Sequence, residues 1–183
     1  MERIERLREQ IYNRKLQRLR VATDSRITHL AQARSVAICF PAQNVTERKQ
    51  ALAYADRLRK AGKRIKLLAF IPVVDKEATF AFDYFTKKDI GFGRYPKGPV
   101  IDKFLSKAYD AFICLFPHTN PQIEFLSAAV RAKLQIGPRP ERAVANFDIM
   151  IDAPANYQIA DFIRYYEEIF AKSSQAVLEA SKV

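Results

Sequence analysis

The chain has 183 residues and a hydrophobic content of 49%, which is enough for one compact domain and a small appendage. Its formal net charge of +11 attracts polyanions, either nucleic acid or an acidic membrane surface. No apolar stretch reaches bilayer length and no signal peptide is recognisable, so we expect a cytoplasmic protein without a transmembrane segment.

The two cysteines, Cys39 and Cys114, both lie inside apolar runs. Free cysteine behaves as a small hydrophobic residue, so we expect both thiols to be reduced and buried. The sequence has only two histidines and no cysteine pair at short spacing, which excludes the usual structural metal patterns. We therefore expect neither a metal nor a cofactor.

Residues 1–20 contain no Gly or Pro and are rich in helix-forming residues, which predicts a helix. The last seven of these residues carry four bases and no acid: Arg14, Lys15, Arg18 and Arg20. Two interpretations remain open, an amphipathic helix that packs on the domain and a basic arm that docks on a partner. We treat residues 1–34 as a basic helical arm and connection, and residues 35–183 as a single α/β domain.

Apolar runs of strand length alternate with helical patterns after residue 34. We expect strands at 35–40, 65–71, 111–116, 133–136 and 147–152, with helices at 44–61, 100–108, from 121, and 157–181. Asn44 and Asn120 are expected N-caps, and Gly62 a C-terminal stop. The alternation predicts an α/β fold with a doubly wound (Rossmann/flavodoxin-like) five-stranded parallel sheet in the order 2-1-3-4-5. Residues 73–97 interrupt this alternation of strands and helices. We expect them to form a loop, part of which is a short extra strand.

A basic loop within this interruption contains Lys87, Lys88 and Arg94, interleaved with aromatic residues such as Phe92 and Tyr95. Basic side chains contact phosphates and aromatic rings stack on unpaired bases, so the mixture suits RNA. An ordinary basic loop whose rings complete the core would have the same composition.

His118, Thr119 and Asn120 follow the strand expected at 111–116, at the edge where open α/β sheets bind ligands. A ligand-binding role and a local capping role are both open for them. The loop at 41–44 lacks the glycines of a dinucleotide site. Asp110 and Asp148 precede their strands and should lie at the opposite edge, so we assign no catalytic residue.

Four segments of the sequence resemble a family of small bacterial proteins known only as a domain of unknown function. These segments are 82–90, 109–113, 127–137 and 147–152. The resemblance covers about residues 35–170 and implies a fold without an activity. The unit 109–137 is also similar to the acceptor half of heptosyltransferase-like glycosyltransferases, in which an Asp before a strand is followed by a helix and a Lys-x-x-x-Gly turn.

Two classes of function follow from these patterns. The first is a non-enzymatic protein that associates with RNA or a ribonucleoprotein through the basic residues of the N-terminal helix and of the loop. The second is a small-ligand (nucleotide or nucleotide-sugar) binding protein, or a degenerate glycosyltransferase-like enzyme, using residues 118–120. A protein partner is also open. Attachment to a membrane surface is disfavoured because the N-terminal helix has Glu among its bases.

Overall fold

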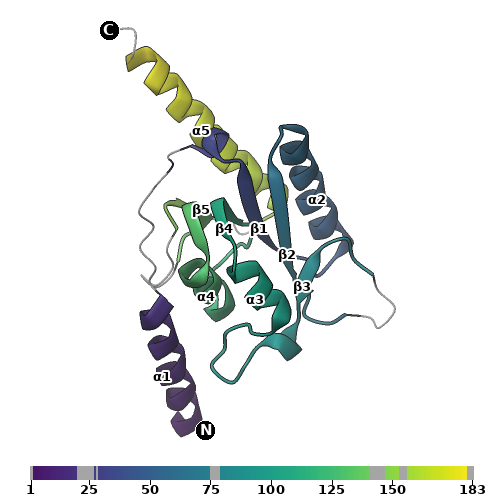
Figure 1. The fold of residues 1–183 in the computed structure, drawn as a ribbon, viewed down its shortest axis with the longest axis vertical. Coiled ribbons are helices and arrows are strands. Elements are labelled where there is room, and N and C mark those ends of the chain that lie inside the picture. Colours follow the sequence, from purple (N-terminus) through teal and green to yellow (C-terminus); the bar gives the residue numbers. More distant parts are fainter. Residues whose placement is uncertain are drawn as a thin grey trace.

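The computed structural model describes residues 2–19, 27, 29–74, 79–140, 147–152 and 156–180, with the side chains of the last helix described to Lys172. Helices and strands alternate along most of this chain, but β3 directly follows β2 and β6 directly follows β5 in the order of described elements (Figure 1). The helices are α1 (Glu2–Leu19), α2 (Val45–Lys60), α3 (Pro99–Leu105), α4 (Pro121–Ala129) and α5 (Ile159–Ala180), with short 3₁₀ turns η1 (Leu30–Gln32) and η2 (Lys87–Asp89). The strands are β1 (Ser35–Pro41), β2 (Arg64–Phe70), β3 (Asp83–Phe85), β4 (Ala108–Cys114), β5 (Arg131–Pro138) and β6 (Ile149–Ile151).

The strands form one parallel sheet in the order β3-β2-β1-β4-β5-β6. The expected count of five strands was one short, although the five expected strands do lie in the predicted order. The sixth, β3, lies within residues 73–97, where a short extra strand was expected outside the five-stranded sheet, and it pairs with β2 at the edge of the sheet. It is only three residues long and buries only Phe85, so it leaves no apolar run in the sequence.

Some element boundaries differ from the sequence-based expectation. β4 begins at Ala108 rather than 111, and α3 correspondingly ends at Leu105 rather than 108. α4 ends at Ala129, and β5 runs over Arg131–Pro138 rather than 133–136. β6 is confined to Ile149–Ile151, and α5 begins at Ile159 rather than 157. The early start of β4 comes from its pairing with β5, in which Ala108 and Tyr109 are the register partners of Arg131 and Ala132.

The local signals at helix ends were predicted correctly. Asn44 caps α2 by accepting a hydrogen bond from the amide of Glu47 at 2.9 Å, and Glu47 completes a capping box. Asn120 caps α4 in the same way, with Pro121 at the first helical position. Gly62 follows α2 at φ +80°, a conformation that glycine adopts without steric cost.

Helices cover both faces of the sheet (Figure 1). α2 and α5 pack on one face, in a core that includes Tyr54 and Tyr166. α1, α3 and α4 contribute to the core on the other face, which contains Tyr12, Phe104 and Phe112. The N-terminal helix is therefore packed on the domain, with Tyr12 and Leu16 buried.

Cys39 and Cys114 lie side by side as register partners on β1 and β4, and both are fully buried free thiols. The prediction of buried cysteines in parallel strands is confirmed. Burial raises the pKa of the Cys114 thiol to about 12 and raises that of Cys39 well above its usual value. Both thiols are therefore protonated and unreactive near neutral pH.

Candidate functional site

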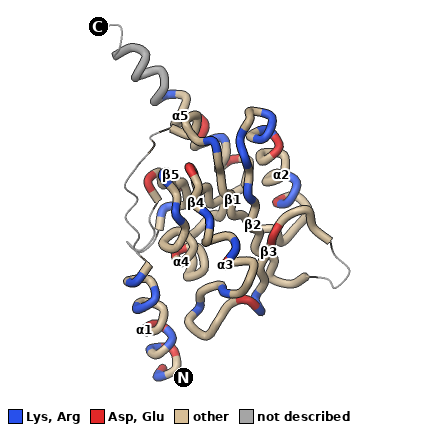
Figure 2. The backbone as a smooth tube through the Cα atoms, in the orientation of Figure 1, with Lys and Arg blue, Asp and Glu red and all other residues tan. Residues whose placement is uncertain are grey.

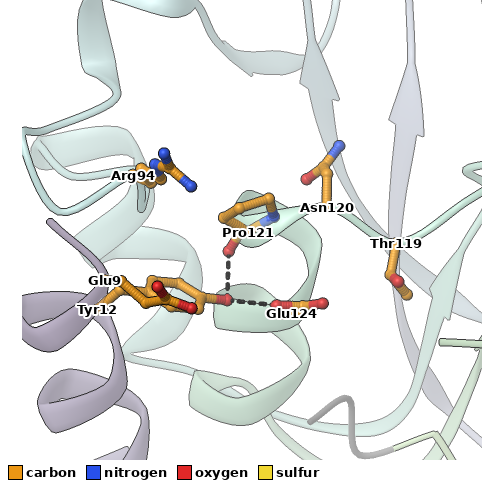
Figure 3. Close-up of a pocket in the computed structure, with 7 residues that line it drawn as sticks. All are labelled: Glu9, Tyr12, Arg94, Thr119, Asn120, Pro121 and Glu124. Atoms are coloured by element: carbon orange, nitrogen blue, oxygen red, sulfur yellow. Dashed lines mark hydrogen bonds between the residues drawn. The ribbon is translucent and has the colours of Figure 1, made fainter. Parts of the chain in front are cut away.

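α1 is attached to α4 through a buried polar contact (Figure 3). The hydroxyl of Tyr12 donates a hydrogen bond to the carboxylate of Glu124 at 2.8 Å and lies 2.9 Å from the carbonyl oxygen of Pro121. Glu124 is only 8% exposed although it lies in the first turn of α4, where a carboxylate interacts favourably with the helix dipole. Leu16, one turn further along α1, is buried in the same core as Tyr12.

α1 also contacts the loop that joins η2 to α3. Glu5 forms an ion pair with Arg94 of this loop. The guanidinium carbon of Arg8 lies 4.9 Å from the centre of the Phe92 ring, and the ammonium group of Lys15 lies 6.0 Å from that of Tyr95. The structure thus brings the N-terminal helix and the aromatic loop together, although some 80 residues separate them in the chain.

We call the outer part of this junction the α1 surface and define it as Arg8, Arg14, Lys15, Arg18 and Phe92. The ring of Phe92 is 50% exposed, and the side chains of Arg14 and Arg18 are exposed one helical turn apart. The acidic residues of α1 are confined to positions 2, 5 and 9 (Figure 2). Residues 10–19 of α1 therefore present positive charge without a local acid.

The other basic residues predicted for nucleic acid differ in their placement. Lys87 and Lys88 are exposed on η2. Arg94 is exposed, but it shares the carboxylate of Glu5 with Arg8, which pairs with it at 3.0 Å, so Glu5 neutralises part of the charge of both arginines. Arg20 lies outside the described residues. Sequence reasoning did not single out Arg8, because its pairing with Phe92 depends on how α1 docks.

The loop predicted to bind a small ligand lines a cleft of about 610 Å³ at the carboxyl ends of β1 and β4. His118 is exposed there, while Thr119 and Asn120 are half-buried. The Oδ1 atom of Asn120 accepts hydrogen bonds from the amides of Gln122 and Ile123, both at 3.0 Å, so this atom serves to cap α4.

Thr119 and Asn120 also line a second, smaller pocket of about 240 Å³ (Figure 3). Its remaining lining residues are Glu9, Tyr12, Arg94, Pro121 and Glu124. Because the Tyr12 hydroxyl is already engaged with Glu124 and Pro121, this pocket marks the junction of α1 with the domain rather than an open arrangement of catalytic groups.

Asp110 and Asp148 lie near the amino ends of their strands, as predicted, although Asp110 is inside β4 rather than before it. The carboxylate of Asp110 accepts hydrogen bonds from the amides of Arg34 and Ser35 and from the Ser35 hydroxyl, each at 3.0 Å, and pairs with Lys133 at 3.0 Å. Burial alone would raise the pKa of Asp110, but these hydrogen bonds together hold it well below the usual range. Asp148 accepts a hydrogen bond from the amide of Gln135 at 2.8 Å. Both carboxylates therefore join strands of the sheet.

Within the described ranges, no three His, Cys, Asp or Glu side chains gather as metal ligands would. The described helices also include none with the length and apolarity needed to cross a bilayer.

Comparison with known proteins identifies one family. The model of DUF6913, a family of unknown function, matches residues 5–169. Neither a curated protein nor a solved structure matched the chain.

Proposed function

The chain belongs to DUF6913, a family of unknown function, and we propose that it is a non-enzymatic protein that binds single-stranded RNA on the α1 surface. The observation that carries this proposal is the half-exposed ring of Phe92 beside the Arg8 guanidinium, on the same junction as the acid-free part of α1. Stacking rings combined with a cationic track form the usual arrangement for contacts with unpaired nucleotides.

The two components would contact different parts of the strand. An unpaired base can stack on the free part of the Phe92 ring, with Arg8 adding a cation–π contribution. Arg14 and Arg18 lie four residues apart and therefore on one side of α1, where they can contact phosphates. The helix rises about 15 Å between residues 8 and 18, which is long enough for more than one phosphate.

We assign different roles to the remaining basic residues. Lys87 and Lys88 extend the positive charge beyond α1, since both are exposed on η2. Arg94 holds α1 in place through its ion pair with Glu5, and its contribution to binding is correspondingly small. Lys15 supports the positive potential from its position near Tyr95. A cytoplasmic location accords with this role.

We also infer that the sheet is of the doubly wound type. Its strands extend outward from the central pair β1 and β4, toward β2 and β3 on one side and toward β5 and β6 on the other. Helices cover both faces. This arrangement leaves a topological switch point between β1 and β4.

RNA binding is tested by fluorescence anisotropy of a labelled single-stranded RNA of mixed sequence, titrated with the full chain at several salt concentrations. Each lost phosphate contact lowers the slope of log affinity against log salt by about 0.7. The double variant R14A/R18A should therefore lower the slope by about 1.4. F92A should weaken binding by about 1–3 kcal/mol and leave the slope unchanged, because it removes stacking and not charge.

The matched control is K49A/K60A, which removes two exposed positive charges from α2 on the opposite face of the sheet. It should leave the salt slope unchanged. Equal losses in both double variants would mean that only the net charge attracts RNA. If F92A also binds like the wild type, the α1 surface is not the binding site.

A protein partner is a second candidate, because Ile4 and Leu7 are 54% and 50% exposed on the first half of α1. Capture by such a partner would withstand high salt and would be lost in the variant I4A/L7A. Binding of RNA would show the opposite dependence on salt.

A further inference from the structure

The cleft at the switch point between β1 and β4 has the size and location of a small-molecule site. Ligands of open α/β sheets bind outside the carboxyl ends of the strands, at the point where the order of strands reverses. The volume of about 610 Å³ falls within the range of ligand pockets. The cleft is formed by the ends of β1 and β4 and by the segment that precedes α5.

The walls of this cleft combine aromatic rings with neutral hydrogen-bonding groups. Phe70, Phe116 and Tyr157 line it. The hydroxyl of Tyr157 donates a hydrogen bond to the carbonyl of Leu115 at 2.6 Å, which fixes the ring against β4. The amides are those of three further lining residues: Gln43, Asn156 and Gln158. Such walls suit a flat molecule with hydrogen-bond donors and acceptors along its edge.

The cleft is poorly suited to phosphate. At the start of α2, the side chain of Asn44 accepts a hydrogen bond from the amide of Glu47. The carboxylate of Glu47, which lines the cleft, accepts one from the amide of Gln43 at 2.7 Å. The first free amides of α4 are likewise bonded to Asn120. The N-terminus of α4 is thus occupied by the chain's own side chain, and that of α2 holds the Glu47 carboxylate, which repels an anion.

The charges of the residues that line the cleft also disfavour phosphate. Among the described residues that line the cleft, none is Lys or Arg, and His118 is the one side chain able to carry a positive charge. Glu47 contributes a negative charge at the wall. A nucleotide would bring its phosphate against this carboxylate, with no Lys or Arg among the described lining residues to balance it.

We propose that this cleft binds an uncharged heteroaromatic molecule of the nucleoside or free nucleobase class, and that it rejects the corresponding nucleotide. The ring would pack against the aromatic wall, and its amide-like edge would pair with the Gln and Asn side chains. A base within an RNA chain carries phosphates on both sides and is excluded for the same reason. The cleft is therefore a site separate from the α1 surface.

The test uses the full chain and the four common ribonucleosides in calorimetric titrations and thermal unfolding, at pH 8, where an ordinary imidazole is neutral. We expect at least one nucleoside to bind and to raise the unfolding temperature, with an affinity that is equal at low and high salt. The matching 5′-monophosphate should bind at least about tenfold more weakly, a difference of about 1.4 kcal/mol.

Two variants place a large side chain in the cleft. The side chains of Gln158 and Gln43 are exposed, so Q158W and Q43W should fold and block binding. K49W places the same ring on exposed α2 outside the cleft and should bind like the wild type. R14A/R18A should likewise keep nucleoside binding, which separates this site from RNA binding.

Three results would overturn the proposal: no binding of any nucleoside at millimolar concentration, equal or tighter binding of the monophosphate, or unchanged binding in both tryptophan variants. None of them would bear on whether the α1 surface binds RNA.

Discussion

The hydroxyl of Tyr12 donates a hydrogen bond to the buried carboxylate of Glu124 across 112 residues of chain. This contact joins the N-terminal helix to α4, the helix that follows the candidate ligand loop (Figure 3). Because Tyr12 and Leu16 share a core with the sheet residues Phe112 and Cys114, α1 stabilises the domain while its other side remains exposed. The same helix thus combines a packed face with a basic one.

The first prediction concerns this contact. Y12F removes the donor and leaves the buried Glu124 carboxylate without it, so the free energy of unfolding should fall by about 1–3 kcal/mol. Urea unfolding measures the change. N13A, on the exposed side of α1, should stay within about 0.5 kcal/mol of the wild type. If Y12F is as stable as N13A, the hydrogen bond does not hold α1 in place.

The second prediction concerns Gly137 on β5, where the ring of Phe147 packs closely against the glycine. A Cβ atom at this position would lie 2.4 Å from the ring of Phe147. G137A should therefore destabilise the protein by about 1–3 kcal/mol or more, through overpacking. The smaller side chain in G137A/F147L should restore part of this loss.

Gly62 supplies the control for the variants G137A and G137A/F147L. An added Cβ atom there meets no other group, but the residue has φ +80°. G62A should cost about 1–2 kcal/mol through backbone strain alone. Adding F147L to G62A should restore none of the lost free energy of unfolding. If it does restore part, F147L stabilises the protein by a route other than relief of the clash at Gly137.

The third prediction concerns the buried thiols. Cys39 and Cys114 should react with a thiol reagent such as a disulfide dye only when the protein unfolds, since burial both excludes the reagent and raises the pKa of each thiol. The rate of modification should rise with urea concentration in parallel with unfolding. Fast labelling of the folded protein without urea would show that β1 and β4 open locally.

The central sheet could be predicted from the sequence because its signals are local. Unbroken apolar runs, such as 111–116, and the stops that follow them indicate buried parallel strands. Asn44, Gly62 and Asn120 mark helix ends through hydrogen bonds or dihedral angles within a few residues. These elements appear in the structure in the expected order.

What the sequence did not predict depends on long-range contacts. The start of β4 depends on its pairing with β5, where Ala108 is the register partner of Arg131. A short extra strand was expected within residues 73–97, but its exact place at Asp83–Phe85 follows from pairing with β2, because three residues give no periodic signal. In the candidate sites, the residue type and spacing indicated a basic aromatic loop, but the pairing of Arg8 with Phe92 follows from the docking of α1. A sequence pattern contains no information on such a pairing.

The fourth prediction concerns Asp110 and acid pH. Hydrogen bonds from Lys133, Ser35 and the Arg34 amide hold its pKa below the unfolded value of about 3.9, and its side chain is 20% exposed. Above that value the carboxylate is ionised in both states, so its stabilising contribution is fully present. As the pH falls below about 4, the unfolded chain takes up a proton first, and the contribution is lost progressively.

The variant D110N removes this ionisation and the ion pair with Lys133. Its free energy of unfolding at neutral pH should be lower than that of the wild type by about 1–3 kcal/mol. The difference should shrink as urea unfolding is repeated from about pH 6 down to about pH 3, at a rate of up to about 1.4 kcal/mol per pH unit. D102N removes an exposed carboxylate from α3 and is the control. A difference between wild type and D110N that stays constant over this range would show that Asp110 acts through packing alone, because only a lowered pKa makes the contribution depend on pH.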